Sequence, residues 1–387
     1  MGVDTLGRTF RIGTIKNIDV MVHPTFAIIV LWVMYQWGVT AGEGLAGVVF
    51  GAIVVMSVFG CVLLHELAHA LTARQHGQRV HDITLLPIGG VARVEQTHMS
   101  PRSESIIALA GPAMNVAIAL MLTPLVAIVV AMRHLDHPVS ILLYASEVSL
   151  AGFVLYLWIA NLMLAAFNMI PAFPMDGGRV LRAVLSRFRG KTEATHVAVI
   201  IGYGFAFALA IGGILAGDLL MPLVSVFIVV AAQMEVSHVR IESALRRLPV
   251  GQFALWEAGG IRPDAPLAHA IHGGPRDVAV TRDGVVVGML WRSDLLRHLN
   301  GAHRELYVRD IMDRRFNAVD VSDSVYDVHL WLATSSRPAV PVIENGIYRG
   351  IFTTERLAHV YEHLDRNNFR WQRNLVGAIQ RLRLASR

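Results

Sequence analysis

Hydrophobic residues occur along this chain in long blocks, not in the short alternating runs of a soluble protein. A helix needs about 20 consecutive apolar residues to cross a bilayer, and six blocks approach or exceed that length. The six predicted spans are residues 23–42, 45–71, 104–131, 144–168, 195–216 and 219–237. Beyond residue 240 the pattern changes to mixed charge with short apolar runs, which is typical of a soluble α/β unit.

Composition agrees with this division. The chain of 387 residues is 54% hydrophobic and only 16% charged, with a mean hydropathy of +0.50. Soluble domains carry about 25% charged residues, so we expect an integral membrane protein in contact with the lipid bilayer. The net charge is +5, but the basic residues gather in loops beside the spans. Membrane topology explains that placement, and no nucleic-acid partner is expected.

The distribution of lysine and arginine predicts the orientation in the membrane. Twelve of them precede the first span or lie in the loops between spans two and three and spans four and five, against Arg133 alone on the opposite side. These twelve are Arg8, Arg11, Lys16, Arg74, Arg79, Arg93, Arg102, Arg179, Arg182, Arg187, Arg189 and Lys191. By the positive-inside rule we expect a multi-pass protein of the cell (inner) membrane with both termini cytoplasmic.

Three ionisable residues interrupt the second span. His65, Glu66 and His69 follow an uncharged run over residues 45–64. Residues four apart share one face of a helix, so both imidazoles can bind one metal ion while Glu66 faces its water. An ionisable group at membrane depth costs about 2.5–3.5 kcal/mol, so three of them need a compensating partner. The simpler alternative is that the histidines only form hydrogen bonds between helices. We prefer the interpretation as a metal site.

A catalytic zinc ion usually has three protein ligands and a water, so this motif needs one more. Asp176 is the candidate because it lies where the fourth span is broken, on the same side of the membrane as His69. Pro171 and Pro174 end the helix there, and the two glycines after Asp176 allow a tight backbone. An ordinary aspartate of a helix-terminal turn is the alternative.

Three segments resemble the signature motifs of the site-2 protease family of intramembrane metalloproteases. They are LHELAHA at residues 64–70, GPAMN at 111–115 and N-x-x-P-x-x-P-M-D-G-G at 168–178, with Ala68 where many members have glycine. The resemblance covers residues 1–240 and implies one zinc ion per chain, held by His65, His69 and Asp176. It also implies that Glu66 is the general base for hydrolysis of a peptide bond in or near a transmembrane helix of a membrane-protein substrate.

Two further sets of residues are candidates for substrate binding. Residues 80–95 read as two short strands and a turn, which we expect to form a membrane-associated β-hairpin. Its segment 88–91, with Gly89, Gly90 and Val91, offers an edge that can bind an unwound substrate by strand addition. Asn115 and Asn168 are polar at membrane depth and can stabilise the oxyanion or the substrate backbone; hydrogen bonding between helices is equally compatible with them.

The C-terminal part contains an internal repeat. Residues 277–296 align with 339–358, each with an Asp-Gly or Asn-Gly turn between strands and a helix after them. The repeat resembles a tandem pair of CBS domains, which often bind adenine nucleotides through a threonine and an aspartate. The first copy keeps Asp294 but has Trp291 for the threonine, and the second keeps Thr353 but has Arg356 for the aspartate. An adenine nucleotide at these two residues and a structural or homodimerising role both stay open.

These observations combine into one predicted architecture. The fold class is a polytopic α-helical membrane protein, with six transmembrane helices and a short membrane-associated β-hairpin, joined to a cytoplasmic α/β CBS-domain pair. The predicted domains are residues 1–240, 241–302, 303–365 and a basic amphipathic tail at 366–387. The predicted function is a zinc-dependent intramembrane endopeptidase, and the alternative is a CBS-regulated metal-ion transporter or channel.

Overall fold

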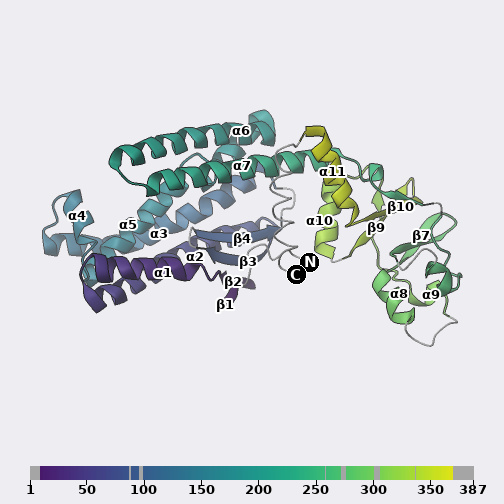
Figure 1. Cartoon of the computed structure of the whole chain (residues 1–387), viewed down its shortest axis with the longest axis horizontal. Coiled ribbons are helices and arrows are strands. Elements are labelled where there is room, and N and C mark those ends of the chain that lie inside the picture. Colours follow the sequence, from purple (N-terminus) through teal and green to yellow (C-terminus); the bar gives the residue numbers. More distant parts are fainter. Residues whose placement is uncertain are drawn as a thin grey trace. The chain divides into compact units, whose positions relative to one another are not determined.

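The computed structural model describes residues 9–86, 89–95, 99–257, 259–271, 276–299, 306–335 and 337–368. The chain divides into two compact units, with the boundary between Val239 and Arg240. Figure 1 labels the helices and strands of both units. We describe each unit by itself. The predicted amphipathic tail lies outside the described residues, apart from its first three.

The N-terminal unit is built from long apolar helices. Five helices in the described part of the chain are long and apolar enough to cross a membrane. They are α2 (Gly44–Gln75), α3 (Pro101–Arg133), α5 (Leu150–Asn168), α6 (Asp176–Ala216) and α7 (Leu220–Arg247). The first predicted span contains α1 (Phe26–Tyr35) and a π-helix (Gln36–Thr40), which together rise only about 22 Å. A short helix, α4 (Pro138–Tyr144), lies between α3 and α5.

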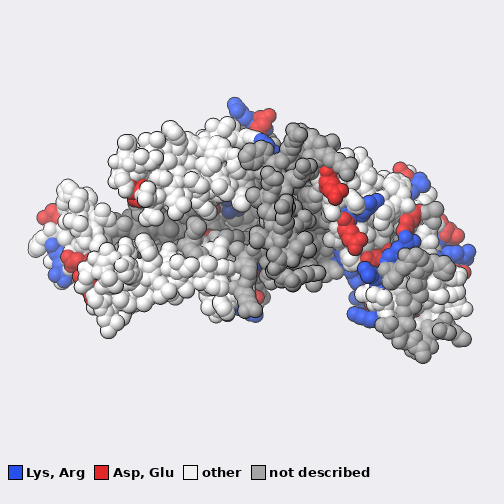
Figure 2. Space-filling view, viewed as in Figure 1, with Lys and Arg blue, Asp and Glu red and all other residues white. Residues whose placement is uncertain are grey.

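Helix α3 lies at the centre of the helical packing and contacts α2, α5 and α6. Helix α1 packs on α2. A Cβ on Gly47 would overlap the backbone of the π-helical extension, and a Cβ on Gly51 would be in tight contact with the backbone of α1. Helix α6 is kinked at Gly190, which has φ 77°, and Gly217 ends it before the turn into α7. The surface over these helices is almost free of charged side chains on the face in view, whereas the C-terminal unit carries many (Figure 2).

A four-stranded sheet packs against one end of α2. Its strands are β1 (Phe10–Ile15), β2 (Ile18–Val22), β3 (Arg79–Leu86) and β4 (Gly89–Glu95), in that spatial order. The predicted hairpin corresponds to β3 and β4, and β2 adds to it in parallel. Ile18 and Ile83 are fully buried against Ala70 of α2 and Ile107 of α3, so this small core fixes the sheet beside the HExxH helix.

The C-terminal unit repeats one motif twice. The first copy has β6 (Val278–Arg282), β7 (Val285–Leu290) and α8 (Arg292–Leu299), and the second has β9 (Ala339–Glu344), β10 (Ile347–Thr353) and α11 (Arg356–Asn368). The hairpin turns are where the repeat predicts them, and Asp283 and Asn345 have the positive φ of such turns. The remaining elements are η2 (Val250–Gln252), β5 (Leu255–Trp256), η3 (Leu267–Ile271), α9 (Val308–Ile311), β8 (Val319–Asp320) and α10 (Val325–Ser335).

Candidate metal centre

His65 and His69 lie one turn apart on α2, and both side chains are buried. The helical spacing puts the two imidazoles on one face, as the sequence predicts. Their Nε2 atoms are 3.1 Å apart, and the rings meet at an interplanar angle of 83°.

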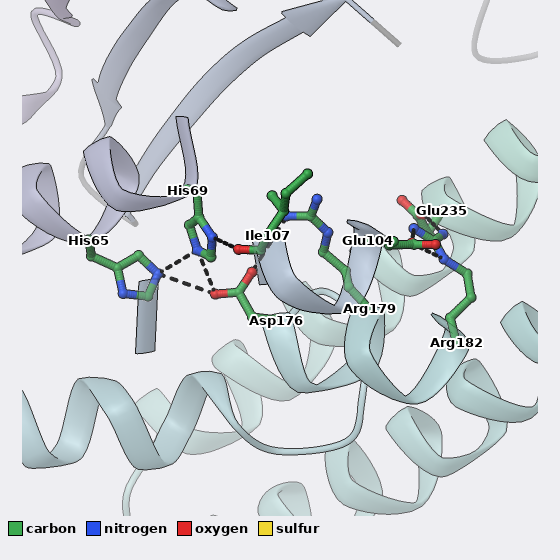
Figure 3. A network of polar contacts seen from close by, with 8 residues as sticks. All are labelled: His65, His69, Glu104, Ile107, Asp176, Arg179, Arg182 and Glu235. Atoms are coloured by element: carbon green, nitrogen blue, oxygen red, sulfur yellow. Dashed lines mark hydrogen bonds and ion pairs between the residues drawn. The ribbon is translucent and has the colours of Figure 1, made fainter. Parts of the chain in front are cut away.

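Asp176 joins the two histidines from the first turn of α6. Its Oδ2 atom lies 3.2 Å from His65 Nε2 and 3.0 Å from His69 Nε2, so three donor atoms converge on one point (Figure 3). The loop before α6 folds back tightly on the helix, since a Cβ on Gly177 or Gly178 would overlap the backbone of residues 169–173. This loop brings a helix start to the histidines, and the helix dipole favours a carboxylate there.

The hydrogen bonds of the other ring nitrogens decide which tautomer faces Asp176. His65 Nδ1 lies 2.5 Å from Asn115 Oδ1, and His69 Nδ1 lies 2.6 Å from the carbonyl oxygen of Ile107. A carbonyl only accepts, and the Asn115 amide nitrogen is engaged in donating to Asn161 Oδ1 at 3.0 Å. Both Nδ1 atoms therefore carry a proton, so in the neutral form of each ring the Nε2 atom presents its lone pair to the carboxylate.

With both rings neutral, three lone-pair donors converge on one point, and a bound cation satisfies all three. Three such ligands are the usual protein contribution to a catalytic zinc site, in which ligand bonds of about 2.0–2.1 Å place neighbouring donors about 3.3 Å apart. The measured separations of 3.0–3.2 Å are close to that value. In the described part of the chain, these residues form the one group of His, Cys, Asp and Glu side chains with the spacing of a metal site.

Gly111 of α3 provides the space beside these donors. A Cβ at this position would lie 2.6 Å from His65 Nε2 and would overlap His69 Nε2 as well. Every other amino acid would therefore place carbon atoms where an ion and its ligands must fit. The chemistry of the donors and the space at Gly111 both fit a resident metal ion.

Glu66 is partly buried, and its side chain lies next to strand β4 of the sheet. A Cβ on Gly90 of β4 would lie 3.0 Å from the carboxyl carbon of Glu66 and 3.3 Å from its Oε1. The absence of a side chain at Gly90 thus lets strand β4 approach the Glu66 carboxylate directly. Among the described strands, β4 pairs only with β3, so its other edge has no described strand partner.

The other predicted substrate-binding residues differ in their location and in their hydrogen bonds. Gly89 and Val91 are in β4, on either side of Gly90. Asn115 is fully buried and both ends of its amide are engaged, with His65 and with Asn161. Asn168 ends α5 and is half-buried, and the structure describes no hydrogen bond from it to the three donors.

Several residues around the site were not singled out by sequence reasoning. Asn161 of α5 extends the hydrogen-bond chain from His65 and Asn115 to the thiol of Cys61, with Nδ2 to Sγ at 3.3 Å. Arg179 lies 3.6 Å from the second oxygen of Asp176. Asn161 could have been found as a polar residue within a predicted span. The role of Ile107 could not, because every residue type has a backbone carbonyl.

The predicted nucleotide-binding residues occupy separate places in the C-terminal unit. Asp294 is in the first turn of α8 and pairs with Arg297 at 3.5 Å, and Thr353 is the last residue of β10. Trp291 is buried, and its indole nitrogen donates to Asp313 at 3.0 Å. A cavity of about 290 Å³ is lined by Trp291, Arg315, Phe316, Asn317, Trp331, Ser335 and Arg337, and neither Asp294 nor Thr353 lines it.

Known proteins are similar to this chain over the segment that contains these residues. Residues 52–211, which include both histidines and Asp176, match peptidase family M50. A zinc metalloprotease of Methanocaldococcus jannaschii is 29% identical over 355 residues, which cover 89% of this chain and 94% of that protein. The family match and this relative support a peptidase and do not favour the transporter alternative.

Two solved structures are similar to separate parts of the chain. The site-2 protease from Methanocaldococcus jannaschii is 32% identical and covers 59% of this chain and 95% of that one, with a TM-score of 0.44. The CBS domain of a membrane protein from Sphaerobacter thermophilus is 20% identical and covers 33% of this chain and 96% of that one, with a TM-score of 0.29. From the family match and the relatives, the chain belongs to peptidase family M50, the site-2 protease family, and is a metallopeptidase of that type.

Proposed function

We propose that this protein is an intramembrane zinc endopeptidase that hydrolyses peptide bonds in or near transmembrane segments of membrane-protein substrates. The observation that carries the proposal is the convergence of three lone-pair donors, His65 Nε2, His69 Nε2 and Asp176 Oδ2, within 3.0–3.2 Å of one another. These residues would hold one zinc ion per chain. Bound zinc supplies a water of lowered pKa and polarises the scissile carbonyl.

Glu66 acts as the general base in this proposal. Glu66 follows His65 directly on the helix and therefore points away from the face that carries the two histidines. Its carboxylate lies beside the metal ligands but is not one of them. There it can take the proton of the attacking water and return it to the leaving amine. His65, His69 and Asp176 are buried, and a buried site with little bulk water strengthens these interactions.

In this proposal, the edge of β4 that is not paired with β3 binds the substrate. A transmembrane helix hides its carbonyl groups in its own hydrogen bonds, so a substrate segment must unwind before it is cut. A strand edge supplies backbone partners for the unwound segment. Because Gly90 of β4 contacts Glu66, a segment added at this edge lies next to the base.

The membrane arrangement is also part of the proposal. The apolar side chains of α1 are exposed, with Ile28 and Leu31 at 66% and 64%, so lipid contact suits this helix as the sixth span. The excess of Lys and Arg on one side places both termini and the CBS pair in the cytoplasm of a multi-pass cell-membrane protein. The domain limits at 240, 302 and 365 and a homodimer through the C-terminal unit stay predictions.

Metal analysis combined with a cleavage assay tests the active site. Purified wild-type protein should hold one equivalent of zinc, and His65→Ala should lose it. Glu66→Gln should keep the zinc and lose cleavage, because the amide keeps the shape but takes no proton. Equal zinc in wild type and His65→Ala would refute the ligand assignment, and rapid turnover by Glu66→Gln would remove Glu66 as the base.

The C-terminal unit has a second candidate function, which is binding of a purine nucleotide in the cavity beside Trp291. Two indoles, a phenyl ring and two arginines line this cavity, and such groups stack on bases and pair with phosphates. Equilibrium dialysis of the full chain with AMP and ATP should show binding that Trp331→Ala weakens. Binding that depends instead on Asp294 and Thr353 would refute the cavity as the site.

A further inference from the structure

A buried ionic network joins three helices of the N-terminal unit beside the metal centre (Figure 3). Arg182 of α6 donates to Glu104 Oε1 through Nε at 2.8 Å and through Nη2 at 2.5 Å. Its remaining Nη1 contacts Glu235 of α7. The guanidinium also lies 4.9 Å from the ring of Phe173, in the loop that precedes Asp176.

The two ends of the Glu104–Arg182 pair lie close to groups that hold the metal donors. Glu104 is one turn before Ile107 on α3, and the Ile107 carbonyl accepts from His69 Nδ1. Arg182 is on the same helix as Asp176, six residues further along α6. This ion pair therefore connects the helix that orients His69 to the helix that carries Asp176, and α3 and α6 are in direct contact.

We propose that Arg182 is a positioning residue for the metal centre, and that its pair with Glu104 fixes α3 against α6 so that Asp176 meets His69. This inference rests on the proposed metal site, but it concerns residues that touch neither metal nor substrate. His69 belongs to α2, but its ring is held by Ile107 of α3, so the 3.0 Å separation between its Nε2 and Asp176 Oδ2 also depends on how α3 packs against α6. A direct charge-assisted bond between the helices resists changes in that distance.

The two carboxylates of the network should contribute unequally. The side chains of Glu104 and Arg182 are 11% and 9% exposed, whereas that of Glu235 is 31% exposed. A desolvated pair in a low dielectric is strong, and a partly hydrated one is screened. In addition, only Glu104 lies on α3, the helix whose Ile107 carbonyl accepts from His69. Glu104→Gln and Glu235→Gln are thus matched variants that each remove one carboxylate from the same guanidinium.

Zinc affinity measured by chelator competition on the full-length protein in detergent tests this inference. Glu104→Gln should bind zinc about tenfold more weakly, the lower end of the range for partners that orient ligands. Glu235→Gln should change the affinity by less than about threefold. The visible spectrum of the cobalt-substituted protein should shift for Glu104→Gln and match wild type for Glu235→Gln, which reports ligand geometry without using activity.

A double variant separates positioning from stability. Glu104→Met with Arg182→Met removes both buried charges, and an apolar replacement of similar volume usually recovers stability. The unfolding temperature should therefore return toward that of wild type while the zinc affinity stays low. Equal losses for the two Gln variants, or recovery of affinity together with stability, would show that Arg182 is only structural. Absence of zinc from wild type would instead refute the metal site itself.

Discussion

Replacement of Asn115 by alanine is the most direct test of how the protein prepares its metal ligands. Asn115 is fully buried, with its Oδ1 2.5 Å from His65 Nδ1 and its Nδ2 3.0 Å from Asn161 Oδ1. Truncation removes both partners at once and leaves the His65 N–H and the Asn161 carbonyl buried and unpaired. Each unpaired group costs about 1–3 kcal/mol, so the metal-free protein should be clearly destabilised.

The effect on the metal comes from the freedom that His65 gains. Without an acceptor at Nδ1, the imidazole can rotate or change its tautomer, and the Nε2 lone pair no longer points only at Asp176. Loss of such a partner lowers metal affinity about 10–100-fold, which corresponds to about 1.4–2.7 kcal/mol. Chelator competition measures this change on detergent-solubilised protein, and thermal unfolding of the metal-free form measures the structural cost separately.

Asn115→Asp is the matched control. The carboxylate still accepts from His65 Nδ1, so zinc affinity should be retained or increased, because a charged acceptor raises the basicity of the imidazole. The donor to Asn161 is lost in both variants, so a difference between them reports the acceptor alone. Wild-type zinc affinity in Asn115→Ala, or equal losses in both variants, would refute the orientation of His65 by Asn115.

Three further predictions follow from single contacts. Gly111→Ala should abolish zinc binding in a protein that still folds, measured by metal analysis and circular dichroism, because the new Cβ would lie 2.6 Å from His65 Nε2. Gly90→Ala should keep zinc but reduce cleavage at least about tenfold, since its Cβ displaces the Glu66 carboxylate from β4; unchanged cleavage would separate the strand from the base. The hydrogen bond from Trp291 helps to hold the pKa of Asp313 below its usual value, so the stabilisation by Asp313 is complete above pH about 4 and is lost as the pH falls below it. Asp313→Asn should lower the unfolding temperature at pH 7 and flatten this acid dependence.

Much of the membrane unit can be predicted from two sequence patterns: the long apolar segments and the helical spacing of the metal-binding motif. A bilayer requires long uncharged helices, so five of the six predicted spans correspond to the five long apolar helices. The first is the exception, because 23–42 contains a shorter helix that ends in a π-helical segment. Hydropathy reports how apolar a segment is but not how its backbone is wound. The fixed spacing of His65 and His69 along a helix likewise makes their shared face predictable.

The partners of the site are not predictable in the same way, because they come from distant segments. His69 is held by the backbone carbonyl of Ile107, and any residue type supplies a carbonyl. Strands β1 and β2 complete the sheet from an N-terminal segment that the search for long apolar spans passed over, although Ile18, Val20 and Val22 alternate as in a strand. Arg179 and Arg182 were counted as loop charges for the orientation, yet both are in α6 and form ion pairs. Segments with few charged residues indicate where the spans are, but the sequence does not show which charged residues form ion pairs.

The polar residues of the membrane unit form two chains that meet at the metal donors. One runs from Cys61 through Asn161 and Asn115 to His65, and each link is a described hydrogen bond. The other runs from the Arg182 network along α3 and α6 to His69 and Asp176. In a low dielectric, a satisfied polar chain is rigid and an unsatisfied one is costly, so each link restricts the next. A protein that must hold three ligands among apolar helices can therefore orient them from a few interior contacts, and substitutions at these contacts should alter metal affinity more than they alter the fold.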